Sequence, residues 1–141
     1  MKKILIAVDG SNHARRALAT AAELASALNG TLLVVTVDEP GPLKGAVAEF
    51  ARTEDLSRQE VTDQILGSAA ENARKEGAKE VETAFATGDA AEGILSLADE
   101  HKADMVVLGA RGLTNLQGLV MGSVSHKVMQ LTGLPCLIVR Q

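Results

Sequence analysis

Apolar runs alternate with stretches of helical periodicity along the first half of this chain. Ile4–Val8 is a continuous apolar run, which is typical of a strand covered on both faces of a parallel sheet. Apolar residues then recur at helical spacing from Ala14 to Leu28, and Asn29-Gly30 would end that helix. Thr31–Val37 is rich in β-branched residues and predicts a second strand.

The region that follows the second strand is longer than an ordinary connection. Its apolar positions from Leu43 to Glu76 fall partly at helical spacing and predict one long helix, which Gly77 would end. Glu80–Ala86 alternates polar and apolar residues, as a half-exposed strand does.

The last third of the chain contains two more helix and strand pairs. The turn Thr87-Gly88-Asp89 would cap a helix that ends near His101. Asp104–Leu108 predicts the fourth strand. A glycine-rich loop, a helix to about Leu131 and a final strand, Cys136–Val139, complete the chain.

Five strands separated by helical segments predict an α/β fold with a parallel sheet, and right-handed crossovers place helices on both faces. For the strand order 3-2-1-4-5, the order reverses between strands one and four, and ligands bind there beyond the carboxyl ends of the strands. Asp9 and the loop that starts at Gly109 would face each other across this crevice, and Asp38 would lie at its side, near a ribose.

The loop after the fourth strand is the strongest candidate for chemistry. Its pattern is Gly109, two residues, Gly112, nine residues, then Gly122-Ser123. Glycines let the backbone come close to a ligand, and the first turn of the next helix presents unpaired N–H groups, so this arrangement predicts phosphate binding. Arg111 could neutralise phosphate, and the Ser123 hydroxyl or the Asp9 carboxylate could ligate a bound cation.

Composition excludes several classes of protein. The 141 residues fit one domain, and a net charge of -4 with interspersed signs argues against nucleic acid as a partner. No apolar stretch is long enough to span a membrane, and a single cysteine allows no internal disulfide, so we expect a cytoplasmic protein. Trp and Tyr are absent, so an adenine would lie between aliphatic side chains and backbone.

Other nucleotide folds and catalytic classes find no support in the sequence. No lysine follows a glycine in the Walker A pattern, and Asp9-Gly10-Ser11-Asn12 lacks the dinucleotide-binding glycines. The three histidines show no metal-ligand spacing, and no Ser-His-Asp or Cys-His arrangement stands out. Rapid nucleotide hydrolysis is therefore not expected.

Taken together, these segments resemble the universal stress protein family. The likeness rests on Ile4–Ser11, Val37-Asp38, Thr87-Gly88-Asp89, the glycine pattern from Gly109 to Ser123, and the apolar strand after Pro135. It covers essentially all of residues 1–141 as one domain. The resemblance implies a Rossmann-like fold of the adenine nucleotide alpha hydrolase-like kind, a homodimer, and the branch that binds ATP.

The resemblance also implies a set of binding residues. Asp9 matches the acidic residue at the adenosine end, with Ala7 and Val8 beside it. Thr36 or Val37 matches the position whose backbone contacts adenine. The ribose and phosphate shell matches Leu108, Gly109, Arg111, Gly112, Gly122, Ser123, Val124 and Ser125. Ala110 departs from the family, whose members often carry serine there.

The leading hypothesis is a regulator that binds ATP, or ADP or AMP, with Mg²⁺ near the phosphates and slow or no hydrolysis. The alternatives are a dimeric adaptor that works without nucleotide, and a weak ATPase with Asp9 as base. Because an apolar edge strand needs cover, we expect residues 136–140 to pair with a second copy of the chain. The regulatory protein partner is unknown.

Overall fold

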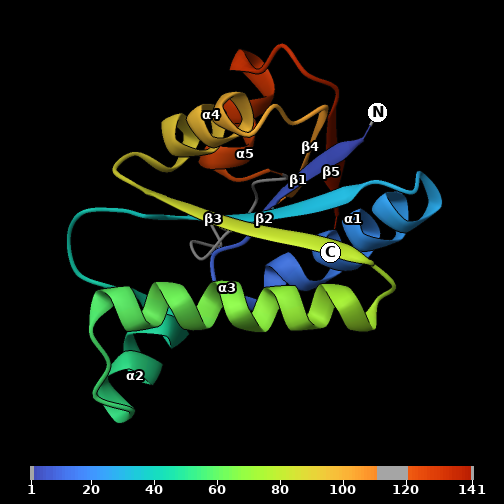
Figure 1. The fold of residues 1–141 in the computed structure, drawn as a ribbon. Coiled ribbons are helices and arrows are strands. Elements are labelled where there is room, and N and C mark those ends of the chain that lie inside the picture. Colours follow the sequence, from blue (N-terminus) through green and yellow to red (C-terminus); the bar gives the residue numbers. More distant parts are fainter. Residues whose placement is uncertain (1, 111–120, 141) are drawn as a thin grey trace.

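The computed structural model describes residues 2–110 and 121–140 (Figure 1). Strands and helices alternate along these residues, as the hydrophobic pattern predicts. The strands are β1 (Lys3–Ala7), β2 (Thr31–Asp38), β3 (Glu80–Thr87), β4 (Met105–Gly109) and β5 (Cys136–Val139). The helices are α1 (Arg15–Ala27), α2 (Gly45–Thr53), α3 (Arg58–Lys75), α4 (Ala90–Glu100) and α5 (Ser123–Leu131), and a 3₁₀ turn, Asn12–Ala14, precedes α1.

The five strands form one parallel sheet in the order β3-β2-β1-β4-β5, which confirms the predicted topology. The strands differ in length, and this difference shapes the edge where the carboxyl ends meet. β2 pairs with β1 only as far as the partners Ala7 and Val35, but with β3 as far as Asp38 and Thr87. The last residues of β2 therefore extend beyond β1.

Helices cover both faces of the sheet (Figure 1). On one face, α1 and α3 pack on Ile4, Ile6 and Val34. On the other, α4 and α5 pack on Leu5, Leu33 and Val35. Neighbouring side chains of a strand point to opposite faces of the sheet. Because both faces are covered, neighbouring residues in the middle of β1 and β2 are all buried, which explains why they are apolar without alternation.

The prediction of one long helix from Leu43 to Glu76 is wrong, because the segment forms two helices, α2 and α3. Asp55 adopts a positive φ of 52°, which interrupts the helical backbone. Ser57 then caps α3 with a capping box: its side chain accepts from the Glu60 N–H, and the Glu60 carboxylate accepts from the Ser57 N–H. The Ser57-x-x-Glu60 signature is visible in the sequence and marks a helix start inside the periodic stretch.

Within residues 2–110 and 121–140, none of the helices combines the length and apolar character that crossing a membrane requires.

Candidate functional site

A pocket of about 330 Å³ lies at the carboxyl edge of the sheet, where β1, β2 and β4 end and α5 begins. Most of the residues predicted to bind a ligand line this pocket. They are Ala7, Val8, Asp9, Thr36, Val37, Leu108, Gly109, Gly122, Ser123, Val124 and Ser125. Arg111 and Gly112, also predicted, lie outside the described residues.

The unequal strand lengths leave the backbone N–H and C=O of one β2 residue facing the pocket. The Val35 carbonyl accepts from the Val8 N–H on the β1 side, and the Asp38 carbonyl accepts from the Gly88 N–H on the β3 side. Residues of a strand alternate in the direction of their backbone groups, so the N–H and C=O of Val37 point, like those of Val35, toward β1. β1 has already ended there, and no backbone bond from the described residues reaches them. Val37 thus offers one donor and one acceptor to a ligand.

The first turn of α5 offers a second set of free groups. The Gly122 N–H donates to the Ala110 carbonyl at 2.5 Å, so the Gly122 amide is already occupied. The next three amides, those of Ser123, Val124 and Ser125, have no acceptor within the part of the chain that is described. Gly122 provides no capping side chain for them. Unpaired amides at the positive end of a nine-residue helix favour an anion.

The Ser125 side chain fixes α5 against β4. Its hydroxyl donates to the Gly109 carbonyl at 2.6 Å, and Ser125 is 8% exposed. The same region is anchored from the other side, because the Ala110 N–H donates to the Val139 carbonyl. Ser125 therefore positions the helix, and its hydroxyl hydrogen is already engaged.

Asp9 has a structural function at the end of β1. One carboxylate oxygen, Oδ1, accepts from the Ser11 N–H at 2.9 Å and from the Ser11 hydroxyl at 2.5 Å. These bonds hold the turn that leads from β1 into the 3₁₀ segment. The other oxygen, Oδ2, has no hydrogen bond from the described residues, so Asp9 keeps one acceptor in the pocket lining.

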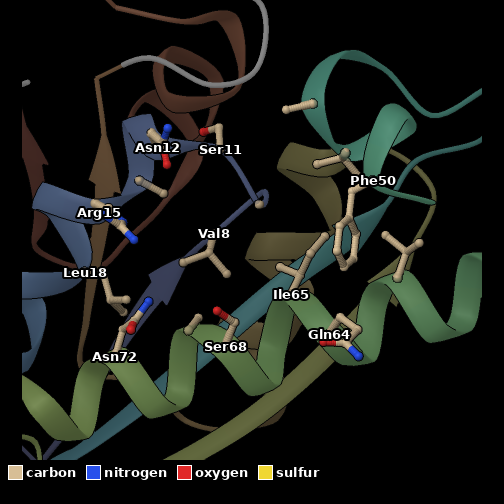
Figure 2. Close-up of a pocket in the computed structure, with 16 residues that line it drawn as sticks. Val8, Ser11, Asn12, Arg15, Leu18, Phe50, Gln64, Ile65, Ser68 and Asn72 are labelled. Atoms are coloured by element: carbon tan, nitrogen blue, oxygen red, sulfur yellow. The ribbon is translucent and has the colours of Figure 1, made fainter. Parts of the chain in front are cut away.

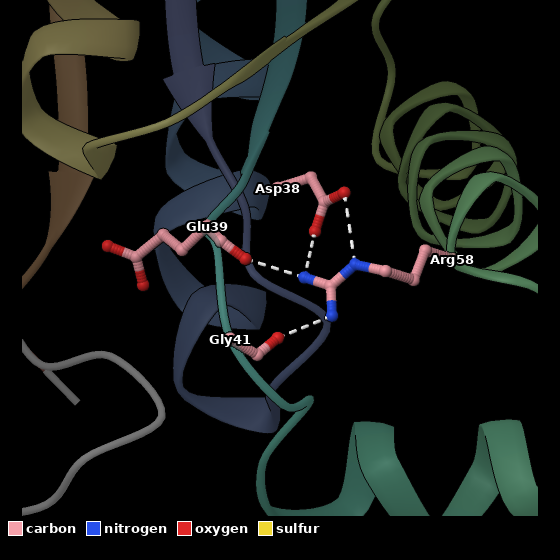
Figure 3. A network of polar contacts seen from close by, with 4 residues as sticks. All are labelled: Asp38, Glu39, Gly41 and Arg58. Carbon is pink, nitrogen blue, oxygen red and sulfur yellow. Dashed lines mark hydrogen bonds and ion pairs between the residues drawn. The ribbon is translucent and has the colours of Figure 1, made fainter.

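Arg58, which the sequence analysis missed, clamps the loop after β2 (Figure 3). Its guanidinium donates to both carboxylate oxygens of Asp38, at 2.5 and 3.4 Å, and to the carbonyls of Glu39 and Gly41 at 2.5 Å. The hydrogen bond that Arg58 donates to the Asp38 carboxylate raises the pKa of Arg58 above its usual value. The sequence analysis expected Asp38 to lie near a ribose. In the structure, the Asp38 carboxylate is already paired with Arg58.

The position of Arg58 carries a signal that the sequence analysis overlooked. It is the first residue of α3, where the helix dipole disfavours a cation. An arginine at that position is favoured by an acidic partner, and here the partner is Asp38. By fixing Asp38 to Gly41, Arg58 shapes one wall of the pocket.

Metal ligands do not gather in the part of the chain described. Within residues 2–110 and 121–140, no group of three or more His, Cys, Asp or Glu side chains could hold a metal ion. Asp9 and Ser123 both line the pocket, and each could contribute at most one protein ligand to a cation held mainly by a bound phosphate.

Comparison with known proteins gives a consistent result. Residues 1–140 match the model of the universal stress protein family. The chain is 37% identical, over 146 aligned residues and 98% of each chain, to the universal stress protein YxiE of Bacillus subtilis. Among solved structures, a universal stress protein in complex with cAMP matches with a TM-score of 0.75 and 29% identity, covering 98% of this chain and 96% of that one. The universal stress protein of Archaeoglobus fulgidus in complex with dAMP matches with a TM-score of 0.70 and 27% identity, covering 98% and 97%.

Proposed function

Because the chain belongs to the universal stress protein family, we propose that residues 1–141 form a single domain that binds an adenine nucleotide, ATP in the first place, and acts as a nucleotide-dependent regulator with slow or no hydrolysis. One observation carries the proposal: the backbone N–H and C=O of Val37 and the first three amides of α5, those of Ser123, Val124 and Ser125, belong to residues that line the same pocket. The complexes of two relatives with cAMP and dAMP support it.

The backbone C=O and N–H of Val37 match the hydrogen-bonding edge of adenine. Its C=O can accept from the exocyclic amino group of the base, and its N–H can donate to a ring nitrogen. Guanine presents an acceptor oxygen where adenine carries the amino group, so it would place acceptor against acceptor. Neighbouring aliphatic side chains, Val8 and Ile94 among them, would contact the base in place of aromatic rings.

The start of α5 suits the phosphates. Three amides that have no acceptor among residues 2–110 and 121–140 lie side by side there, and the helix dipole adds positive potential. ATP and its Mg²⁺ would supply the negative charge and the cation, and the Ser123 hydroxyl or Asp9 Oδ2 could complete the metal's coordination. We propose slow or no hydrolysis because the chain has no Walker A lysine, and Asp9 already accepts two hydrogen bonds from Ser11.

Isothermal titration calorimetry in Mg²⁺ with ATP, AMP, cAMP, adenosine and GTP tests the proposal. We expect ATP to bind, adenosine to bind more weakly because it lacks phosphate, and GTP to bind weakly because of the reversed base edge. If ATP and adenosine bind with equal affinity, while GTP binds weakly, the proposed role of α5 in phosphate binding is refuted. Failure of every nucleotide to bind would favour a nucleotide-independent adaptor.

Ser123→Pro gives a sharper test of the phosphate end. Proline is tolerated at the first position of a helix, and Gly122 has the extended conformation that a residue before proline requires. The substitution therefore removes one amide without breaking α5. We expect about a tenfold loss of ATP affinity, the value of one charge-assisted hydrogen bond, with adenosine binding unchanged. Ser123→Ala, which removes only the hydroxyl, is the matched control.

We also propose a homodimer through residues 136–140. The carbonyls of Pro135 and Val139 accept from β4, so alternation directs the backbone groups of Cys136 and Ile138 to the open edge of the sheet. All four residues of β5 are partly exposed. Light scattering at micromolar concentration should give twice the chain mass, and Ile138→Pro, which removes an outward donor, should give a monomer. A wild-type monomer would contradict this assembly.

A further inference from the structure

A second pocket lies on the face of the sheet that α1 and α3 cover, and Val8 is the one residue among the described, predicted binding residues that lines it. It encloses about 360 Å³ between the start of α1, the middle of α3 and Phe50 of α2 (Figure 2). This volume falls in the range of small-molecule sites.

One side of this second pocket is a row of neutral hydrogen-bonding groups. Gln64, Ser68 and Asn72 follow one another at intervals of four residues, so they stand one helical turn apart on the same face of α3. None of these side chains has a hydrogen-bond partner among residues 2–110 and 121–140. They are available to a polar ligand.

The charge of the lining favours an anion. Arg15 lines the pocket, and Figure 2 shows its side chain extending from the start of α1 toward α3. The chain carries 18 acidic residues, yet none of those described lines this pocket. Arg15 forms no ion pair within the described residues, so its charge is available to an anion that enters the pocket.

Apart from Ser11 and Asn12, the remaining lining carries no polar side chain and includes an aromatic ring. Leu18 and Ile65 contribute aliphatic surface. Phe50, one of only two phenylalanines in the chain, borders the pocket and is 44% exposed. A cationic and hydrogen-bonding rim next to an exposed ring suits a ligand that has an acidic group on an aromatic or aliphatic body.

The two pockets share a wall. Val8, Ala14, Val47, Val61 and Ile65 line both of them, so the two spaces lie next to each other at these residues. We infer that the second pocket is a binding site for a small organic anion with an apolar body, a carboxylate or sulfonate held by Arg15 and α3, and that it can be filled while a nucleotide occupies the first pocket. This site does not depend on the proposed nucleotide binding.

A matched pair of fluorescent probes tests the site. 1-Anilinonaphthalene-8-sulfonate carries an anion on an aromatic body, and N-phenyl-1-naphthylamine is nearly the same body without the sulfonate. The absence of Trp and Tyr leaves little competing protein emission. In Arg15→Gln we expect the sulfonate to bind about threefold to tenfold more weakly and the neutral probe to keep its affinity. Arg16→Gln, the adjacent exposed arginine outside the pocket, should change neither affinity.

A blocking variant locates the probes. Ser68 is exposed, so Ser68→Phe should fill the pocket without disturbing the core, and it should weaken both probes, whereas Ser96→Phe on α4 should not. Circular dichroism confirms that each variant is folded. The inference is overturned if Ser68→Phe leaves both probes bound, if Arg15→Gln fails to distinguish them, or if ATP displaces the sulfonate in proportion to its own binding.

Discussion

Gly10→Ala probes the turn that separates the two pockets. Gly10 follows Asp9 and has a φ of +83°, a conformation that residues with a Cβ adopt at a cost. A Cβ at this position would lie 2.9 Å from Val47 Cγ2 and 3.2 Å from two carbons of Ile65, all part of the shared wall. The substitution therefore introduces both backbone strain and crowding.

The two contributions can be separated. Positive φ costs a residue with a Cβ about 1–2 kcal/mol. Crowding in a packed region adds about 1–3 kcal/mol, and Val47, being β-branched, has little freedom to turn away. Gly41→Ala is the control for strain alone, because Gly41 has a φ of +98° and no atom within 4 Å of the added Cβ.

Urea denaturation followed by far-ultraviolet circular dichroism measures the difference. We expect Gly10→Ala to lower the free energy of unfolding by about 1–3 kcal/mol more than Gly41→Ala does. The probe of choice is the backbone signal, since the chain has no Trp or Tyr. Equal losses in the two variants would refute the reasoning, because they would mean that Val47 and Ile65 leave room for a methyl group at position 10.

Three further predictions concern stability and reactivity. Ser57→Ala removes the capping box of α3 and should lower the free energy of unfolding by about 1 kcal/mol in the same urea assay; no loss would contradict the cap. The N–H groups of Lys2 and Lys3 lower the pKa of Asp104, so its stabilising effect is present above the unfolded value of about 3.9 and is lost as pH falls through the lowered pKa. Asp104→Asn should therefore be less stable than wild type at neutral pH, with a gap that closes in acid; a gap independent of pH would count against these bonds. Burial raises the pKa of the Cys136 thiol, so iodoacetamide should alkylate it slowly until urea unfolds the protein, and equal rates in both states would disprove this.

The sequence predicted the sheet because each strand carries a pattern of its own. Ile4–Val8 is an unbroken apolar run, Thr31–Val37 is rich in β-branched residues, and both strands are buried on two faces. Glu80–Ala86 alternates, and β3 is correspondingly half-exposed at the edge of the sheet. The prediction of one helix from Leu43 to Glu76 was wrong. The apolar spacing continues across a break between α2 and α3 that depends on the backbone of Asp55 and the cap at Ser57.

The sequence predicted which residues of the candidate site lie together, because their places follow from the strand order. Residues at the ends of β1, β2 and β4 were expected to meet, and they line one pocket. The Arg58 clamp could not be deduced from spacing, because Asp38 and Arg58 are 20 residues apart and belong to different elements. The second pocket was missed for the same reason: it depends on how α1, α2 and α3 pack together.

The backbone N–H and C=O of Val37 are open because β1 ends where β2 continues. In the proposed binding mode, recognition of adenine at this edge depends on relative strand length more than on side-chain identity. A designer could pair these open backbone groups by extending β1 two residues along β2, or expose such groups in a related sheet by trimming the neighbouring strand. Mutation at Val37 itself would leave the hydrogen-bonding pattern largely intact, so tolerance to side-chain replacement there would be a mark of recognition through the backbone.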